Sequence, residues 1–83
     1  MLFRSMDEPV HLAMIFYLPR GKTVIRAEPT TRPDLSKLVR AVEDALTGVI
    51  YADDAQVVSE YTEKHYADNP RQSGCEIRVG VYA

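Results

Sequence analysis

Cysteine is nearly absent from this sequence, which has one cysteine, Cys75, among its 83 residues. A single thiol cannot form an internal disulfide. Cys75 lies in a segment where apolar residues alternate, so we expect a buried, reduced thiol rather than a nucleophile. Long apolar runs are also missing. The longest, residues 12–18, is far shorter than the ~20 residues that cross a bilayer, which excludes a transmembrane helix.

A secretory signal and an excess of positive charge are absent as well. Asp7, Glu8 and Pro9 stand where a signal peptide would continue its apolar region, so we expect a cytoplasmic protein. Ten Lys and Arg residues against twelve Asp and Glu residues give a net charge of −2. The 46% hydrophobic content is typical of globular chains. We expect one domain, residues 1–83, with a core small enough that a partner chain would add useful burial.

The positive charge that is present is concentrated in residues 20–40. This segment is basic, whereas the remainder of the chain is acidic. A local basic segment can bind phosphate groups. The alternative interpretation is a solvated loop followed by an ordinary helix surface. The basic side chains concerned are Arg20, Lys22, Arg26, Arg32, Lys37 and Arg40.

Apolar periodicity predicts the order strand, helix, strand, strand. Residues 9–18 alternate and predict a central strand, and residues 34–47 have helical spacing that ends before Gly48. Asp34 is placed to cap this helix. The loop at residues 19–33 has room for a short strand at residues 23–26. We predict an α+β fold, a small mixed or antiparallel sheet of about three to four strands packed against one main helix.

The last two strands are predicted over residues 55–66 and 75–83. Between the helix and the first of them lie two adjacent carboxylates, Asp53 and Asp54. Such a pair is tolerated in an exposed turn, where Asp bonds nearby backbone N–H groups. It is also tolerated at a hard-metal site, where the ion cancels the repulsion. The pair alone does not decide between the two.

The stretch "RPDLSKLVRAVEDALTGVIYADDAQVV" combines an aspartate entering a helix, a basic residue one to two turns on, "DAL" and "DDAQV". In this order, these motifs resemble the RusA family of Holliday-junction resolvases, which is common in phages and prophages. The likeness covers roughly residues 9–82. It implies a magnesium-dependent structure-specific endonuclease that acts as a homodimer on four-way DNA junctions, in DNA recombination and repair.

The resemblance also implies roles for individual residues. Asp34 matches the family's first metal-binding aspartate, Asp54 the later essential one, and Asp53 its less critical neighbour. Arg40 stands where the family has a catalytic lysine; it keeps the charge but cannot transfer a proton. We expect the two motifs to meet around one Mg²⁺ near the start of the helix. The predicted DNA contacts are Arg20, Lys22, Arg26, Arg32 and Lys37.

Two departures from the family pattern keep an alternative open. Ser36 replaces the second acid of the first motif, and its hydroxyl can ligate Mg²⁺ without contributing charge; it can equally be an ordinary polar residue of the first helical turn. Relatives also carry a strand, a loop and a helix before the segment that matches residues 10–18. The alternative is a catalytically weakened or inactive dimerising module that binds DNA or a partner. A small ligand-binding α+β module is a third interpretation.

Overall fold

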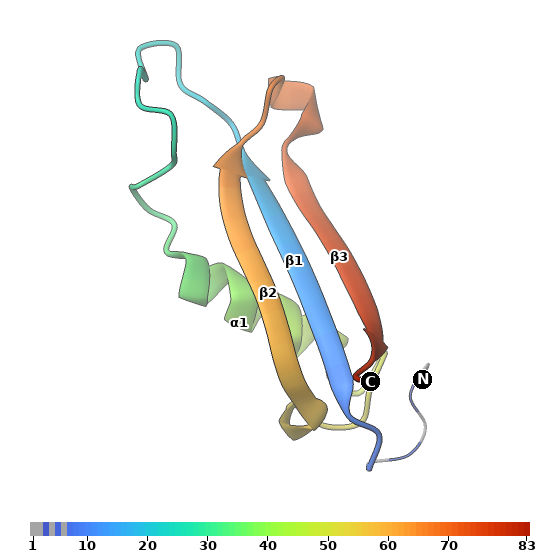
Figure 1. Ribbon diagram of the computed structural model, residues 1–83. Coiled ribbons are helices and arrows are strands. Elements are labelled where there is room, and N and C mark those ends of the chain that lie inside the picture. The colour runs from blue at the N-terminus through green and yellow to red at the C-terminus, as the bar shows by residue number, and fades with distance from the viewer. Residues whose placement is uncertain (1–2, 4, 6) are drawn as a thin grey trace.

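The computed structural model describes residues 3, 5 and 7–83, which form three strands and one α-helix (Figure 1). The elements follow in the order β1 (Val10–Leu18), α1 (Leu35–Leu46), β2 (Val57–Tyr66) and β3 (Gly74–Val81). Two short 3-10 turns, η1 (Asp54–Gln56) and η2 (Pro70–Gln72), precede β2 and β3. The predicted α+β fold, with a small mixed sheet and one main helix, is confirmed.

β1 is the central strand of a sheet whose order is β2-β1-β3. It runs parallel to β2, starting from Val10 beside Val57, and antiparallel to β3, where Val10 lies beside Val81. A parallel pair needs a long crossover connection, which the loop at residues 19–33 and α1 supply. The helix therefore starts at the end of the sheet where β1 finishes and runs back toward the end where β1 begins.

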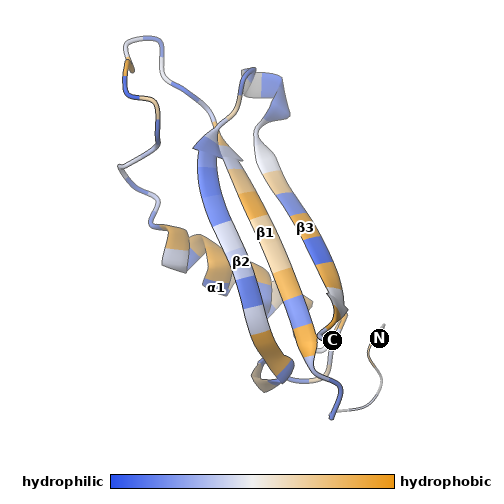
Figure 2. Ribbon diagram, viewed as in Figure 1, coloured by the Kyte–Doolittle hydropathy of each residue, from blue (hydrophilic) through white to orange (hydrophobic). Residues whose placement is uncertain are grey.

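The core lies between β1 and α1. Leu12 and Met14 of β1 are fully buried, and burial alternates along the strand because successive side chains point to opposite faces. Burial of such a side chain contributes about 1.5–3 kcal/mol. Figure 2 shows β1 as the most apolar strand and the C-terminal half of β2 as polar. The helix side of this core consists of Leu35, Leu38, Val39, Val42 and Leu46.

The chain turns sharply where α1 ends. Thr47 donates from its backbone N–H and its hydroxyl to the Glu43 carbonyl oxygen, at 3.0 and 2.7 Å. Gly48 then adopts a φ of +80°, a conformation that residues with a Cβ rarely adopt. The fully buried Tyr51 follows and packs in one cluster with Val10. The segment after the helix is thereby held at the beginning of β1.

Most of β3 lies outside the cover that α1 provides, although Val79 packs against the core. Its apolar residues face the helix side of the sheet as predicted, since Ile77 pairs with Met14. Ile77 is nevertheless 40% exposed and Val81 is 58% exposed, and Cys75 is exposed as well. The prediction of a buried Cys75 is wrong because the single helix packs over β1 and leaves β3 open.

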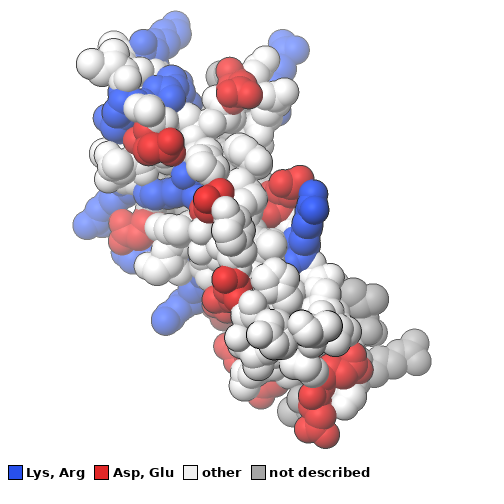
Figure 3. Space-filling view, viewed as in Figure 1, with Lys and Arg blue, Asp and Glu red and all other residues white. Residues whose placement is uncertain are grey.

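The loop at residues 19–33 has no regular secondary structure, so the short strand around residues 23–26 is not formed. It leaves the end of β1, rises beyond the sheet and returns to the start of α1 (Figure 1). Lys and Arg side chains gather over this end of the molecule, whereas Asp and Glu predominate at the opposite end (Figure 3). Among the described residues, no helix has the length and apolar character needed to cross a membrane.

Candidate functional site

Asp34 lies immediately before α1, and its carbonyl oxygen accepts hydrogen bonds from the N–H groups of Lys37 and Leu38, at 3.1 and 3.2 Å. Its carboxylate makes no capping bond to the helix backbone, contrary to expectation. It lies instead 3.9 Å from Lys37 Nζ, with both side chains exposed. An exposed pair of this kind contributes little stability. Asp34 also lines an open cavity of about 450 Å³ together with Arg32.

One side chain of β2 fixes the start of α1 to the sheet. Lys64 Nζ donates to the carbonyl oxygens of Thr31 and Pro33, at 2.8 and 2.9 Å. Lys64 pairs with Phe16 near the end of β1. Asp34 is therefore held at the end of the sheet where β1 and β2 finish. Sequence periodicity gave no signal for this role of Lys64, because the contact joins segments that are distant in the chain.

Asp53 forms the cap of η1. Its Oδ1 accepts a hydrogen bond from the Ala55 N–H at 2.9 Å, and this bond is the main cause of the lowered pKa of Asp53. The Gln56 side chain completes the turn by accepting from the N–H groups of Ala52 and Asp53, both at 2.9 Å. The turn interpretation of the acidic pair therefore applies to Asp53.

Gln56 is a structural residue of this site that the sequence analysis missed. It is buried, with 6% exposure, and its Nε2 donates to the carbonyl oxygens of Ser5 and Glu8, at 3.0 and 3.1 Å. The pattern of Asp53 followed three residues later by a glutamine is a capping box, which was available as a sequence signal. Gln56 connects the acidic turn to the segment that precedes β1.

Asp54, the exposed first residue of η1, lies near two glutamates. Glu43 of α1, which is half-buried, has a pKa raised from 4.5 to about 7, mainly because its carboxyl group is partly removed from solvent. A hydrogen bond with the side chain of Glu60 and the negative charges of Glu60, Asp54 and Asp44 raise it further. This end of α1 is thus strongly acidic, and no basic group contributes to lowering the pKa of Glu43.

The structure separates the two aspartates that were expected to meet. Asp34 precedes the first turn of α1, whereas the charge of Asp54 acts on Glu43 in the last turn. A helix of 12 residues is roughly 18 Å long. The expectation that the Asp53-Asp54 pair emerges near the start of the helix is wrong, because parallel pairing of β1 with β2 places that pair at the other end. Among the described residues, no group of three His, Cys, Asp or Glu side chains is arranged to hold a metal ion.

The basic side chains of the helix and loop are on the surface. Ser36 and Lys37 lie in the first turn of α1, and Arg40 lies one turn further on; all three are exposed. Lys22 and Arg32 are exposed in the loop. The structure thus collects the predicted DNA-contact residues at the end of the sheet that holds Asp34, in the region where Figure 3 shows basic side chains.

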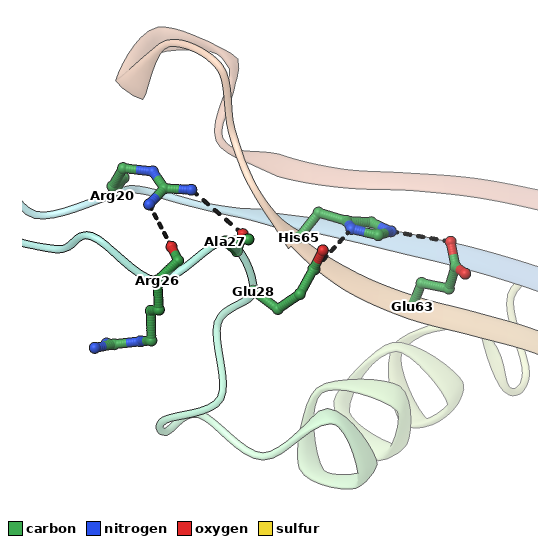
Figure 4. A network of polar contacts seen from close by, with 6 residues as sticks. All are labelled: Arg20, Arg26, Ala27, Glu28, Glu63 and His65. Atoms are coloured by element: carbon green, nitrogen blue, oxygen red, sulfur yellow. Dashed lines mark hydrogen bonds and ion pairs between the residues drawn. The ribbon is translucent and has the colours of Figure 1, made fainter.

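Two arginines shape the loop as well as charging it (Figure 4). The Arg20 guanidinium donates to the carbonyl oxygens of Arg26 and Ala27 and lies 4.2 Å from the centre of the Tyr66 ring. The Arg26 guanidinium lies 5.9 Å from the same ring centre and donates to the Thr31 hydroxyl at 3.2 Å. The basic loop therefore packs against the ring of Tyr66, at the end of β2, through its two arginines.

A histidine adds a second tie between the loop and β2 (Figure 4). His65 Nδ1 lies 3.4 Å from Glu28 Oε2, and its Nε2 lies 3.0 Å from Glu63 Oε1. The hydrogen bond with Glu63 raises the pKa of His65, and Glu28 adds to the effect. The same bond lowers the pKa of Glu63. Glu28 was not identified from the sequence, because its partner lies on a strand that follows the helix.

Comparison with known proteins gives these residues a context. The family model described as endodeoxyribonuclease RusA matches residues 3–79, nearly the whole chain. The uncharacterized protein YqaN of Bacillus subtilis (strain 168) is 36% identical over 75 residues, which cover 76% of this chain and 53% of that protein. The chain thus spans about half the length of that curated relative. No solved structure matches.

Proposed function

Since this chain belongs to the RusA family of endodeoxyribonucleases, we propose that it binds four-way DNA junctions and hydrolyses their phosphodiester bonds with the help of Mg²⁺. RusA-family nucleases act on branched DNA and generally depend on a divalent metal. The observation that carries the proposal is the family match over residues 3–79, which includes Asp34, Asp53 and Asp54.

The charge distribution supports a DNA-binding role for the end of the sheet that holds Asp34. The exposed side chains of Lys22, Arg32, Lys37 and Arg40 lie there, and cations grouped on one surface bind the phosphate backbone. Because the rest of the chain is acidic, DNA should approach this end in preference to the other.

A Mg²⁺ site made from both aspartates does not fit within one chain. Oxygen ligands of Mg²⁺ lie at about 2.1 Å from the ion, which two carboxylates at opposite ends of α1 cannot satisfy. The proposal therefore includes a homodimer in which Asp34 of one chain lies beside Asp54 of the other. The charges on α1 favour an antiparallel arrangement of two helices, since Lys37 and Arg40 precede the acidic Glu43 and Asp44 along it.

Within such a composite site, the chain's own residues have distinct tasks. A bound divalent ion would polarise the scissile phosphate and make a bound water more acidic. Arg40 and Lys37 would balance negative charge on the phosphate as the bond breaks. Arg40 cannot act as the base, because a guanidinium does not lose its proton in proteins. Ser36 offers a hydroxyl oxygen but no charge, so metal binding should be weaker than in relatives with a second acid.

Cleavage of a four-way junction tests the activity directly. The purified chain is incubated with an end-labelled junction, with and without Mg²⁺, and the products are resolved on a denaturing gel. A linear duplex of the same sequence is the control. We expect Mg²⁺-dependent nicks in the junction only. Junction binding without cleavage at any Mg²⁺ concentration would favour the inactive binding module instead.

Mixing two inactive variants tests the composite site. Asp34→Asn and Asp54→Asn chains are each expected to be inactive alone. If each site takes one aspartate from each chain, a mixed dimer has one intact site, and an equal mixture regains about a quarter of the wild-type sites by random pairing. If both aspartates came from one chain, no mixture would be active. Two preparations of the same variant, mixed in the same way, provide the control.

A further inference from the structure

The loop at residues 19–33 and η2 lie at the same end of the sheet (Figure 1). Two neighbouring cavities are lined by residues from this end. The first, of about 250 Å³, is lined by Tyr17, Tyr66, Asp68 and Gln72. The second, of about 400 Å³, is lined by loop residues that include Arg20 and Lys22. The two share Tyr66, Ala67 and Asp68 as a common wall. A single ligand that extends past this wall would occupy both.

The first cavity has the chemistry of a site for a heterocyclic base. Tyr17 and Tyr66 line it, and stacking on aromatic side chains is how unpaired bases are bound without regard to their sequence. Gln72 can both donate and accept hydrogen bonds, and Asp68 can accept. Their side chains lie at the rim and are exposed, where the hydrogen-bonding edge of a base would reach them. Acceptance by Asp68 favours bases that carry an amino group over thymine.

The second cavity has the chemistry of a phosphate site. Arg20 is held in place by its contact with the Tyr66 ring at 4.2 Å and by its bonds to loop carbonyl groups. Lys22 is exposed beside it and adds a mobile cation. The Asp68 carboxylate on the shared wall repels phosphate. It therefore directs an anionic group toward Lys22 and leaves the space next to Tyr66 for a neutral ring.

We propose that these cavities form a binding site for one unpaired nucleotide, with its base on the Tyr17 and Tyr66 side and its phosphate against Arg20 and Lys22. This inference rests on the proposed function, because it specifies which part of branched DNA the chain recognises. A nucleotide within a duplex cannot enter, since its base is stacked and paired and extraction costs several kcal/mol. An unpaired nucleotide at a branch point has already lost that stacking.

Tyr66 of this wall also lines a cavity on the side toward Asp34. This cavity, of about 210 Å³, lies under the loop and is lined by Tyr66, Arg26 and Arg32. Arg32 also lines the open cavity that Asp34 lines. A strand bound with one base beside Tyr66 would therefore follow a basic path that leads to Asp34. Cleavage should accordingly occur at a fixed number of nucleotides from the unpaired base.

Junctions that contain the fluorescent base analogue 2-aminopurine test the site. One junction has a single unpaired 2-aminopurine at its crossing point, and the other has the analogue paired within an arm. Binding is measured without metal, so that no cleavage occurs. We expect quenching of the unpaired analogue only, and tighter binding of that junction by about 5-fold to 100-fold. The Tyr66→Leu and Gln72→Ala variants should reduce both effects, whereas Tyr82→Leu, an exposed tyrosine beyond β3, should reduce neither.

A short single strand that contains 2-aminopurine separates this inference from the proposed function. Quenching of the strand by the wild type, and less quenching by Gln72→Ala, supports the nucleotide site even for a chain that ignores junctions. Equal binding of both junctions without quenching overturns the site but leaves junction binding intact. Because Tyr66 supports the loop, the folding of each variant is checked by circular dichroism. Quenching that persists unchanged in folded Tyr66→Leu and in Gln72→Ala also overturns the site.

Discussion

The two ends of the sheet hold their aspartates in opposite electrostatic surroundings. Asp34 lies beside Lys37 and below a basic loop, whereas Asp54 lies near Glu43 and Glu60. Charges of these signs would attract DNA to the first end and repel it from the second, and a metal cation would have the opposite preference. The difference shows that the same residue type lies in two opposite electrostatic environments within one short chain. The acidic end would need a cation before it could approach a phosphate.

The largest expected effect comes from removing the Asp54 charge. We expect Asp54→Asn to lower Mg²⁺-dependent junction cleavage by at least about 100-fold. Junction binding should be unchanged or tighter, because one negative charge fewer faces the phosphates. Single-turnover cleavage and equilibrium binding, measured in the same buffer, would show whether the two properties separate.

The neighbouring Asp53 supplies the matched control. Asp53→Asn keeps the oxygen that accepts from the Ala55 N–H, and asparagine caps as well as aspartate. We therefore expect most of the cleavage activity to remain. Equal losses in Asp53→Asn and Asp54→Asn would contradict the separate roles that the structure gives them, as cap of η1 and as exposed charge.

Replacing Gln56 tests how much its hydrogen bonds at the acidic end contribute to stability. Its side chain bonds two backbone N–H groups and two backbone carbonyl groups from its buried position. Gln56→Ala leaves these groups without partners and should lower the free energy of unfolding by about 2 kcal/mol. Urea denaturation measures the change. The exposed Gln72→Ala variant should shift it by no more than about 0.5 kcal/mol, and comparable losses in both variants would refute the structural role of Gln56.

Glu43, at the acidic end, should make the stability of the folded protein depend on pH. Its pKa is raised from 4.5 to about 7 in the folded protein, first by burial and then by Glu60. Its contribution to stability is therefore fully present below about pH 4.5 and is lost as pH rises through about 7. Glu43→Gln should leave the Tm nearly unchanged below pH 5 and raise it at pH 8. The exposed Asp7→Asn variant should show no such dependence on pH. A Glu43→Gln variant with the same change in Tm at both pH values would contradict the raised pKa of Glu43.

The smallest expected effect concerns the basic end and His65. Its pKa is raised above 6.5 by Glu63 and Glu28, so its stabilising contribution is present below pH 6.5 and is lost as pH rises through the raised value. Amide exchange in the loop at residues 19–33, corrected for intrinsic rates, should be slower at pH 6 than at pH 8. His65→Gln should remove the difference. A wild-type loop that is protected equally at both pH values would show that His65 does not hold it.

Local patterns predicted the elements but not their mutual placement. The apolar spacing within residues 35–46 and the alternation in residues 10–18 identified α1 and β1, because both signals depend on near neighbours in the chain. The position of Asp54 depended on whether β2 runs parallel or antiparallel to β1. No pattern within either strand determines that choice. The aspartates were therefore identified as candidates, and the end of the sheet to which each belongs was not.

The predicted burial of Cys75 was wrong for a related reason. Alternation correctly assigned Cys75 and Ile77 to the helix side of the sheet. It does not indicate how many strands of the sheet the helix covers. The contact between Glu43 and Glu60 likewise joins a helix to a strand that follows it, so neither residue alone indicated a raised pKa. The role of Gln56 was different, because its capping-box spacing is local and was open to detection.

The central place of β1 has a consequence for biosynthesis. Val10 must pair with Val57 on one side and with Val81 on the other, so neither edge of the strand can be closed until much later residues have left the ribosome. Of the three described strands, β1 is made first and is also the most apolar one. Pairings so distant in the chain form slowly, and unpaired apolar strands are prone to aggregate. The yield of folded chain during synthesis therefore depends on the time between the synthesis of β1 and that of β2 and β3.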